Sequence, residues 1–274
     1  MSAQSAAPLA AWAEPSAGPA AWRLLTSRVI TFSWLELAKI RHDRTELYTR
    51  AIQPVLWLLV FGETFTRIRV IPTGKLPYMD YLAPGIIAQS ALFVAIFYGI
   101  QIIWERDFGI LTRMLATPTP RIALISGKAF GASVRAISQA LAIFVLSAIL
   151  QVRLDWNPIR LLLALVVIVL GSAFFSCLSM TIAGIVLTRE RLMGIGQAIT
   201  MPLFFASNAL YPVQLMPGWL QWLSRINPLS YEVDALRGLL LGTSFDLVLD
   251  FGVLILAAAA GIAAAAALLD RLAQ

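Results

Sequence analysis

Long apolar runs after residue 46 constrain this chain more than any other feature. A helix needs about 20 predominantly apolar residues to cross the hydrocarbon core of a membrane. Six stretches meet or approach that length: Leu47–Thr66, Tyr81–Trp104, Ala129–Leu150, Leu161–Leu187, Leu192–Leu210 and Leu247–Leu269. Arg50 and Glu63 lie near the ends of the first stretch, and Pro202 interrupts the fifth. The sequence therefore predicts an all-α, polytopic membrane protein with six transmembrane helices over residues 47–274.

The composition excludes a soluble fold. Charged residues make up 13% of the chain and hydrophobic residues 59%, with a mean hydropathy of +0.79, whereas soluble domains are about 25% charged. The one cysteine, Cys177, lies inside an apolar run and is expected to pack rather than to form a disulfide. The net charge of +6 comes without any nucleic-acid-binding motif, so no nucleic-acid partner is expected.

The N-terminal part divides into two segments. Residues 1–21 are rich in Ala, Pro and Ser and are expected to be a disordered tail. Residues 22–46 have helical character, with one apolar face formed by Trp22, Leu25, Val29 and Phe32. Glu36 also falls on that face, so the pattern is imperfect. We expect an amphipathic helix on the membrane surface, where its basic residues suit anionic lipids; a basic, partly ordered arm is the alternative.

The distribution of basic residues predicts the topology. Six spans place both termini on one side of the membrane. Seven of the 21 basic residues then lie on the other side: Arg67, Arg69, Lys75, Arg153, Arg160, Arg225 and Arg237. Arg135 lies within a span, and thirteen remain on the side of the termini. Because basic residues accumulate in the cytoplasm, both termini are expected there.

A short charged segment, ERDFGILTRMLATPTPR, separates the second and third apolar stretches. Helical spacing predicts one continuous apolar face formed by Phe108, Leu111, Met114 and Leu115. The opposite face would hold Glu105, Arg106, Thr112 and Arg113. The prolines in TPTP end the helix. The pattern alone fits both a recognition helix in the cytoplasm and an ordinary interfacial loop helix.

A second motif, NPLSYEVDALRGLLLG, precedes the last apolar stretch. Asn227 suits a helix N-cap and Pro228 the first helical position, while Gly242 suits the end. One apolar stripe is formed by Leu229, Val233, Leu236 and Leu240. Upstream, residues 217–226 form another short piece with Trp219 and Trp222, which favour the membrane interface. Neither piece is long enough to span, so we expect a re-entrant helix pair on the outer side.

Both motifs resemble those of type-two ABC transporter permeases, an export family that includes the daunorubicin-resistance and nodulation-factor permeases. With the six spans, the resemblance covers nearly all of the chain after residue 20. It implies a cytoplasmic coupling helix that rests on an ATPase subunit through Glu105, Arg106, Phe108, Gly109, Leu111, Leu115 and Pro118. The matching outer signature comprises Asn227, Pro228, Ser230, Tyr231 and Arg237.

The resemblance also implies partners. An ABC-type ATPase subunit would bind ATP and magnesium, while a second permease copy, most simply a homodimer, and membrane lipids would surround the pathway. A bacterial plasma-membrane location follows from the same resemblance. This chain has no ATP site of its own, since Ile122 and Ala129 stand where a P-loop around SGKAFG (126–131) needs Gly and Ser or Thr. His42 is the only histidine, and no catalytic cluster or cofactor site is apparent, so we expect a transport subunit rather than an enzyme.

The resemblance suggests export of amphipathic drugs, including cationic ones, or of lipid-like molecules. Export of lipo-oligosaccharides or polysaccharides is the alternative. An ion-coupled secondary transporter is less favoured because mid-span positions are mostly neutral and no internal repeat is evident. The candidate pathway residues are Glu63, Gln89, Phe204, Phe205 and Asn208. Each of them would serve equally well in packing or, for Glu63, in a surface pair with Arg67.

Overall fold

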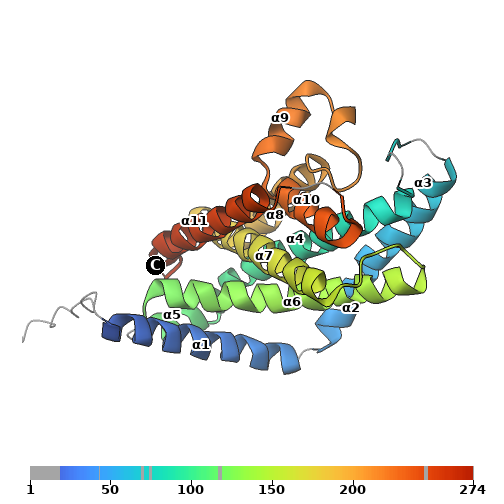
Figure 1. Ribbon diagram of the computed structural model, residues 1–274. Helices are drawn as coiled ribbons and strands as arrows, with labels where there is room; N and C mark the ends of the chain where they lie inside the picture. Colours follow the sequence, from blue (N-terminus) through green and yellow to red (C-terminus); the bar gives the residue numbers. More distant parts are fainter. Residues whose placement is uncertain are drawn as a thin grey trace, which may run out of the picture.

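The computed structural model describes residues 19–42, 44–68, 71–73, 76–116, 119–243 and 246–273, and in these ranges the chain forms helices and no strand (Figure 1). The elements are α1 (Pro19–His42), α2 (Arg44–Leu56), a π-helix η1 (Trp57–Phe61), α3 (Gly62–Ile68), α4 (Tyr78–Asp107), α5 (Ile110–Leu115), α6 (Arg121–Ile149), α7 (Pro158–Val186), α8 (Arg189–Phe205), a 3-10 helix η2 (Val213–Leu215), α9 (Gly218–Ile226), α10 (Pro228–Leu241) and α11 (Leu247–Ala273). The predicted all-α class is confirmed.

Helix α4 forms the centre of the bundle. It packs against α6, α7, α8 and α10, and its residues 80–92 are all buried. Small residues allow this close packing: a Cβ added at Gly85 would lie 2.3 Å from the Ala209 carbonyl oxygen, and one at Gly99 would lie 2.5 Å from the Ser179 Cβ. By contrast, the most apolar window of α11 is only 33% buried, against 83% for α4. Helices at the periphery of the bundle, such as α11, therefore leave apolar surface for lipid.

Four of the predicted spans form long helices that are apolar enough to cross a membrane: α4, α6, α7 and α11. The first predicted span is helical throughout residues 44–68, but the π-helix η1 interrupts its α-helical geometry after Pro54. Proline lacks a backbone donor, which disturbs the regular hydrogen bonds around it. The fifth is the shorter α8, which ends at Phe205 rather than Leu210. The count of six spans stays a prediction.

Helix α1 lies along the first half of α6 and runs parallel to it (Figure 1). Phe32 packs on Gly127 and, one turn later, Glu36 packs on Gly131. Glu36, the apparent flaw in the predicted apolar face, is thus buried, with 2% of its surface exposed, while Trp34 points outward. The side chain of Trp22 lies outside the described residues, and the place of α1 on the membrane surface stays a prediction.

The small residues of α7 serve contacts within the chain. Ser172 and Ser176 are fully buried, the Ser172 hydroxyl donates to the Ser133 hydroxyl of α6, and Ser179 donates to the Ile96 carbonyl of α4. Small residues four positions apart let helices approach closely, and Ser172 and Ser176 have this spacing in α7, where it serves contacts with neighbouring helices of the same chain. It does not supply a free dimerisation face.

The two short helices α9 and α10 form where the sequence predicts them. The Asn227 side chain accepts a hydrogen bond from the Leu229 amide at 3.1 Å, and Gly242 ends α10 with a left-handed φ of 67°. The predicted apolar stripe of α10 is confirmed, because Leu229, Val233, Leu236 and Leu240 have no exposed surface. Helix α10 packs on α4, α7 and α11, whereas α9 stands out from the bundle (Figure 1). The C-terminal end of α11 lies beside α5, at the opposite end of the molecule from α9.

Candidate functional site

A tight turn separates α4 from α5. Helix α4 continues to Asp107, and the Gly109 amide donates to the Arg106 carbonyl at 2.8 Å. Gly109 adopts a φ of 69°, a left-handed conformation that glycine adopts without steric cost. Glu105 and Arg106 therefore belong to the last turn of α4, while α5 begins only at Ile110. We call Asp107–Gly109 the α4–α5 turn.

This turn divides the apolar residues of the segment. Leu111 is fully buried, and Met114 and Leu115 pack half-buried against the core. Phe108, however, is 73% exposed, and Ile110 beside it is 40% exposed. The predicted continuous apolar face from Phe108 to Leu115 is therefore wrong, because the Gly109 turn rotates Phe108 away from α5. The open apolar surface consists of Phe108 and Ile110.

Arg106 and Asp107 of the segment form contacts within the chain. Arg106 donates to the Leu187 carbonyl at 2.8 Å and to Asp107, and Asp107 also pairs with Arg189 of α8 at 3.1 Å. These contacts fasten the end of α4 to the start of α8. The prediction that Glu105 and Arg106 share a helix face with Thr112 and Arg113 is wrong for the same geometric reason. Pro118 lies outside the described residues.

Glu105 pairs with two lysines from other helices. The Lys39 Nζ of α1 lies 2.9 Å from Glu105 Oε1, and Lys128 of α6 contacts Glu105 Oε2. Burial lowers the pKa of Lys39, but the Glu105 and Glu36 carboxylates outweigh that effect and hold its pKa above the ordinary value. Lys39 therefore stays charged at neutral pH.

Arg237 anchors the outer signature. Its guanidinium donates to the backbone carbonyls of Tyr81, Asn208 and Ala209 at 3.3, 2.7 and 3.1 Å, and lies 3.6 Å from the centre of the Tyr81 ring. No ion pair with Asp234 or Glu232 forms, although both lie on the same helix. The Asp234 carboxylate accepts from the Asn208 amide group instead. Arg237 thus joins α10 to α4 and to the chain after α8.

The other outer signature residues join α9 to α10. The Ser230 hydroxyl lies 3.0 Å from the Ser224 hydroxyl, and Tyr231 donates to the Arg225 carbonyl at 2.6 Å. The Asn227 side chain also donates to the Leu203 carbonyl at 2.7 Å while it caps α10. Pro228 follows as the first residue of α10. In this structure the signature residues hold the outer segment in place.

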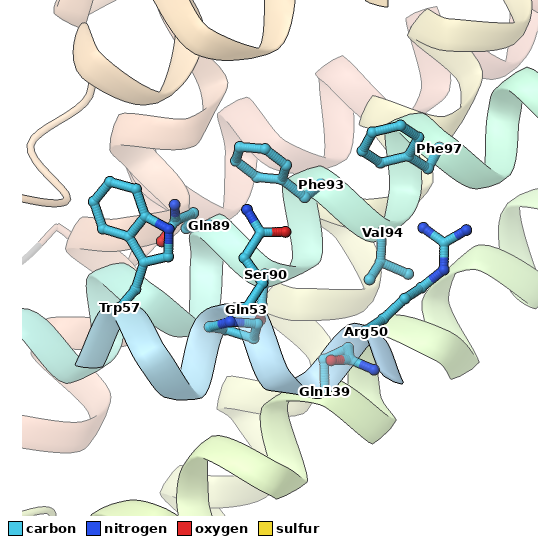
Figure 2. A pocket seen from close by; sticks show the side chains of 10 residues that line it. Arg50, Gln53, Trp57, Gln89, Ser90, Phe93, Val94, Phe97 and Gln139 are labelled. Carbon is cyan, nitrogen blue, oxygen red and sulfur yellow. The ribbon is translucent and has the colours of Figure 1, made fainter. Parts of the chain in front are cut away.

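A small cavity with a mixed polar and apolar lining, the first cavity, opens between the α2–η1 stretch and α4 (Figure 2). It has a volume of about 50 Å³ and is lined by Arg50, Gln53, Pro54, Trp57, Gln89, Ser90, Phe93, Val94, Phe97 and Gln139. Figure 2 shows Arg50, Gln53 and Trp57 along one side of the α2–η1 stretch, directed toward α4. A cavity of this size holds a few water molecules, since one water occupies roughly 10–15 Å³ by this measure.

A second cavity continues from the first. It measures about 330 Å³ and shares Arg50 and Phe97 with the first cavity, while Trp104, Met193 and Gln197 line its far side. The Arg50 guanidinium lies 5.5 Å from the centre of the Phe97 ring, between the two cavities. Together they form a groove along α4, bordered by α2 and α8 and lined by both aromatic and polar side chains. We call it the α4 groove.

Known proteins match most of this chain. The ABC-2 type transporter domain matches residues 27–241, from within α1 to the end of α10. The chain belongs to the ABC-2 type transporter family. It is the permease component of such a transporter, the membrane subunit, and in this family the ATPase is a separate subunit.

Three relatives illustrate the range of the family. A putative transport permease, ycf38, of Cyanophora paradoxa is 30% identical to the permease over 197 residues, which cover 70% of this chain and 66% of the relative. A daunorubicin resistance ABC transporter permease protein, DrrB1, of Streptomyces coeruleorubidus is 24% identical over 80% of this chain and 76% of its own length. Nodulation protein J of Rhizobium leguminosarum bv. trifolii is 29% identical over 69% of this chain and 72% of its own. The match thus spans about two thirds of the ycf38 protein.

The candidate pathway residues of the permease take different positions. Gln89 lines the α4 groove, whereas Phe204 is fully buried and packs edge-on against Trp57 and Phe93. Phe205 follows Phe204 and is 43% exposed. Asn208 is held by Asp234 beside Arg237, near the outer helices. The structure therefore does not bring these residues into one site.

Glu63 lies apart from the α4 groove. Its carboxylate is more than half exposed and lies 3.6 Å from Arg67 one turn later. The groove residues Arg50, Gln53 and Trp57 were not among the predicted candidates. Their spacing of three and four residues on one helix face, with two polar side chains inside an apolar stretch, was the available signal. Within the part of the chain that the structure describes, no three His, Cys, Asp or Glu residues form a metal-ion site.

Proposed function

We propose that this permease forms the membrane pathway of an ATP-driven exporter, with hydrolysis on a separate ATPase subunit bound at the α4–α5 turn. The observation that carries the proposal is the exposure of Phe108, at 73%, next to Ile110. Large apolar side chains exposed side by side on a polar surface commonly mark a protein–protein contact. A few such anchors supply most of the free energy of binding at an interface.

The rest of the turn is held firmly enough to present these anchors. Leu111 fixes α5 to the core, and Arg106 and Asp107 fasten α4 to α8. Phe108 is thus supported from both sides, and little conformational entropy is lost when a partner covers it. The exposed Thr112 and Arg113 supply polar groups beside the apolar pair.

We propose amphipathic drug-like or lipid-like molecules as substrates, moved through the α4 groove. Trp57, Phe93 and Phe97 offer aromatic surface, while Gln53 and Gln89 offer amide groups. Such a mixed lining suits molecules with an apolar body and a polar end. Relatives named for daunorubicin and doxorubicin resistance support this class of substrate.

The grooves of two copies, facing each other, would together enclose a pathway that one open groove only borders. Drug-sized ligands occupy pockets of about 300–1,000 Å³, and the two cavities of the α4 groove, about 50 and 330 Å³, lie below this range and at its lower end. A homodimer with two facing grooves, in the plasma membrane of a bacterium, is therefore the assembly that we propose.

Co-purification followed by reconstitution tests the proposal. The chain should bring an ABC-type ATPase with it from native membranes, and liposomes containing both should hydrolyse ATP faster when daunorubicin is added. The same liposomes should transport daunorubicin. Stimulation by lipid-linked oligosaccharides instead would favour the alternative substrate class, and transport driven by an ion gradient without any ATPase would overturn the proposal.

A further inference from the structure

The stretch SGKAFG (126–131), which does not form a P-loop, belongs to α6 and is the part of that helix on which α1 packs. A Cβ added at Gly127 would lie 2.4 Å from the Phe32 Cβ, and one at Gly131 would lie 2.9 Å from the Glu36 Cβ. Larger residues at either position would push α1 away from α6. Two glycines four residues apart therefore let the two helices approach closely, as small residues do at helix interfaces in membranes.

Beside this contact lie two carboxylates and two lysines, Glu36, Lys39, Glu105 and Lys128, which we call the four-charge cluster. Lys39 lies 3.0 Å from Glu36 and 2.9 Å from Glu105, and Lys128 contacts Glu105 and lies 3.7 Å from Glu36. Each lysine thus bridges both carboxylates. The Tyr98 hydroxyl of α4 donates to Glu36 as well. The cluster joins three helices, α1, α4 and α6, that are far apart in sequence.

The cluster is largely removed from solvent. The side chains of Glu36 and Lys128 are 3% and 6% exposed, that of Glu105 is 13% exposed, and that of Lys39 is 37% exposed. Buried ion pairs add little net stability compared with apolar packing, because desolvation offsets their attraction. They do define one arrangement of their partners, because any shift leaves a buried charge unpaired. The cluster therefore fixes the position of α1 relative to the end of α4 more than it strengthens the fold.

The position of the cluster connects two functional regions. Glu105 lies three residues before Phe108, in the last turn of α4, so the cluster grips the helix end that carries the α4–α5 turn. Glu36 and Lys39 lie near the C-terminal end of α1, which leads through one residue into α2, and Arg50 and Gln53 of α2 line the α4 groove (Figure 2). The segment α1–α2 thus contacts the last turn of α4 through Glu105 and also borders the groove.

We propose that the four-charge cluster transmits movement of the α4–α5 turn through α1 to the groove-lining side of α2. Glu36 and Lys39 are then positioning residues for transport, acting through the turn and the groove rather than on substrate or ATP. This inference rests on the proposed function, since the movement originates in an ATPase bound at the turn. It goes beyond that function by assigning α1 a role in coupling.

Lys39→Gln is the sharpest variant for a test. Lys39 is the most exposed member of the cluster, and its replacement leaves the Glu105–Lys128 pair intact. In liposomes with the ATPase, basal hydrolysis and the amount of assembled complex should stay at wild-type levels. Substrate-stimulated hydrolysis and transport should fall by about fivefold or more, the range of a typical coupling between two sites. Lys39→Arg, which keeps the charge, should restore much of the loss.

Gly127→Ala provides a second variant of different chemistry. It removes no charge but places a methyl group against Phe32, so it should loosen α1 and reduce stimulated hydrolysis as Lys39→Gln does. Arg160→Gln is the matched control, because it removes a cation from a half-exposed ion pair with Asp155 outside the cluster. A nitroxide attached through Trp34→Cys reports the mobility of α1 directly, since Trp34 is 72% exposed and the native Cys177 is buried. Its mobility should rise in both variants and stay unchanged in the control.

The outcomes separate this inference from the proposed function. If the wild-type chain binds no ATPase or shows no substrate stimulation, the proposed function itself fails. If the wild type is stimulated and both variants keep full stimulation while α1 becomes mobile, the cluster does not transmit movement. Equal losses of basal and stimulated hydrolysis together with lower thermal stability would show a purely structural role and would also overturn the inference.

Discussion

Arg237 illustrates how a single buried cation is accommodated between α10 and α4 of the permease. Three backbone carbonyls and the face of the Tyr81 ring surround its guanidinium, and no carboxylate in the described part of the chain forms an ion pair with it. The planar guanidinium can donate in several directions at once, which a lysine ammonium at the end of a flexible stem does less well. The surroundings of Arg237 therefore depend on the planar geometry of the guanidinium and not on its charge alone.

Arg237→Lys should therefore destabilise the protein. The loss of charge-assisted bonds to two or more carbonyls should lower the free energy of unfolding by about 2 kcal/mol or more. Thermal unfolding in detergent measures this effect. Arg160→Lys, at a half-exposed ion pair, serves as the control and should change stability by less than about 1 kcal/mol. Equal stability of the two variants would contradict the assigned role of Arg237.

Phe108 is the strongest candidate anchor for the ATPase. Because its side chain is mostly exposed, Phe108→Ala should leave folding unchanged and weaken ATPase association by about 2 kcal/mol, or roughly 30-fold. Co-purification and titration of the ATPase measure the loss. Phe130→Ala, which removes a 41% exposed aromatic side chain from α6, should have no effect on association. If Phe108→Ala binds the ATPase with wild-type affinity, the α4–α5 turn is an ordinary loop and not the contact with the ATPase.

Leu115 differs from Phe108 in its surroundings. It packs half-buried against the core, so Leu115→Asp would place a carboxylate in apolar contacts. We expect this variant to lower the thermal stability of the permease as well as its association with the ATPase. A selective loss of association at unchanged stability would show that Leu115 faces the partner.

Glu63 is expected to have no part in recognising cationic substrates. Its carboxylate is exposed and paired with Arg67, and exposed pairs of this kind contribute about 0–1 kcal/mol to stability. Glu63→Gln should therefore change transport of cationic and neutral drugs to the same small extent. A selective loss of cationic drug transport would assign Glu63 to the pathway after all.

At the scale of elements, the two outer helices differ in how deeply they pack. Helix α10 is held by its buried stripe and by Arg237, whereas α9 exposes Trp219 and Trp222 at 70% and 64%. Tryptophan favours the boundary between membrane and water. The exposed face of α9 thus fits a position at the outer surface of the membrane, with α10 below it.

Cysteine labelling tests this placement. Gly218 begins α9, and a Cβ added there would meet no other atom within 4 Å, so Gly218→Cys should be tolerated. The native Cys177 is buried and should contribute little background. A membrane-impermeant thiol reagent should label Gly218→Cys, and also Thr243→Cys after α10, from outside intact cells. Labelling of either position from the cytoplasmic side alone would show that the predicted topology is wrong.

At the scale of the whole molecule, one chain offers a groove rather than an enclosed pathway. Ser172, Ser176 and Ser179 of α7 are buried within the chain, where Ser172 bonds to α6 and Ser179 to α4, so they are not available to a partner copy. In the homodimer that we propose, a second copy would complete the pathway on the side of the α4 groove, with α2 along its border.

Cross-linking in native membranes checks this arrangement. Gln53→Cys places a thiol on the exposed side of α2 at the groove, and bifunctional thiol reagents should trap a dimer of the chain. Val145→Cys, on an exposed apolar side of α6, is the comparison and should give little dimer. A complex with the ATPase that contains a single permease copy would contradict the proposed homodimer.

Local patterns in the sequence determined the elements. Apolar runs predicted α4, α6, α7 and α11, and the Asn227 cap and the Gly242 stop predicted the bounds of α10 to within one residue. These features depend on neighbours along the chain: helical spacing, side chains that bond adjacent amides, and glycine at a left-handed position. The two family motifs could be read at the same level, which is why the family was predictable.

Tertiary packing decided the site. Glu36 breaks the apolar pattern of its own helix, yet it is buried because Gly131, Tyr98 and Lys128 meet it from α4 and α6. Glu105 pairs with residues 66 positions before it and 23 positions after it, and no local spacing encodes such pairs. Likewise, Leu111 is buried while Phe108 is exposed because one glycine turn reorients the chain against its neighbours. Which charges meet, and which apolar side chains stay open, depends on how the helices pack in space.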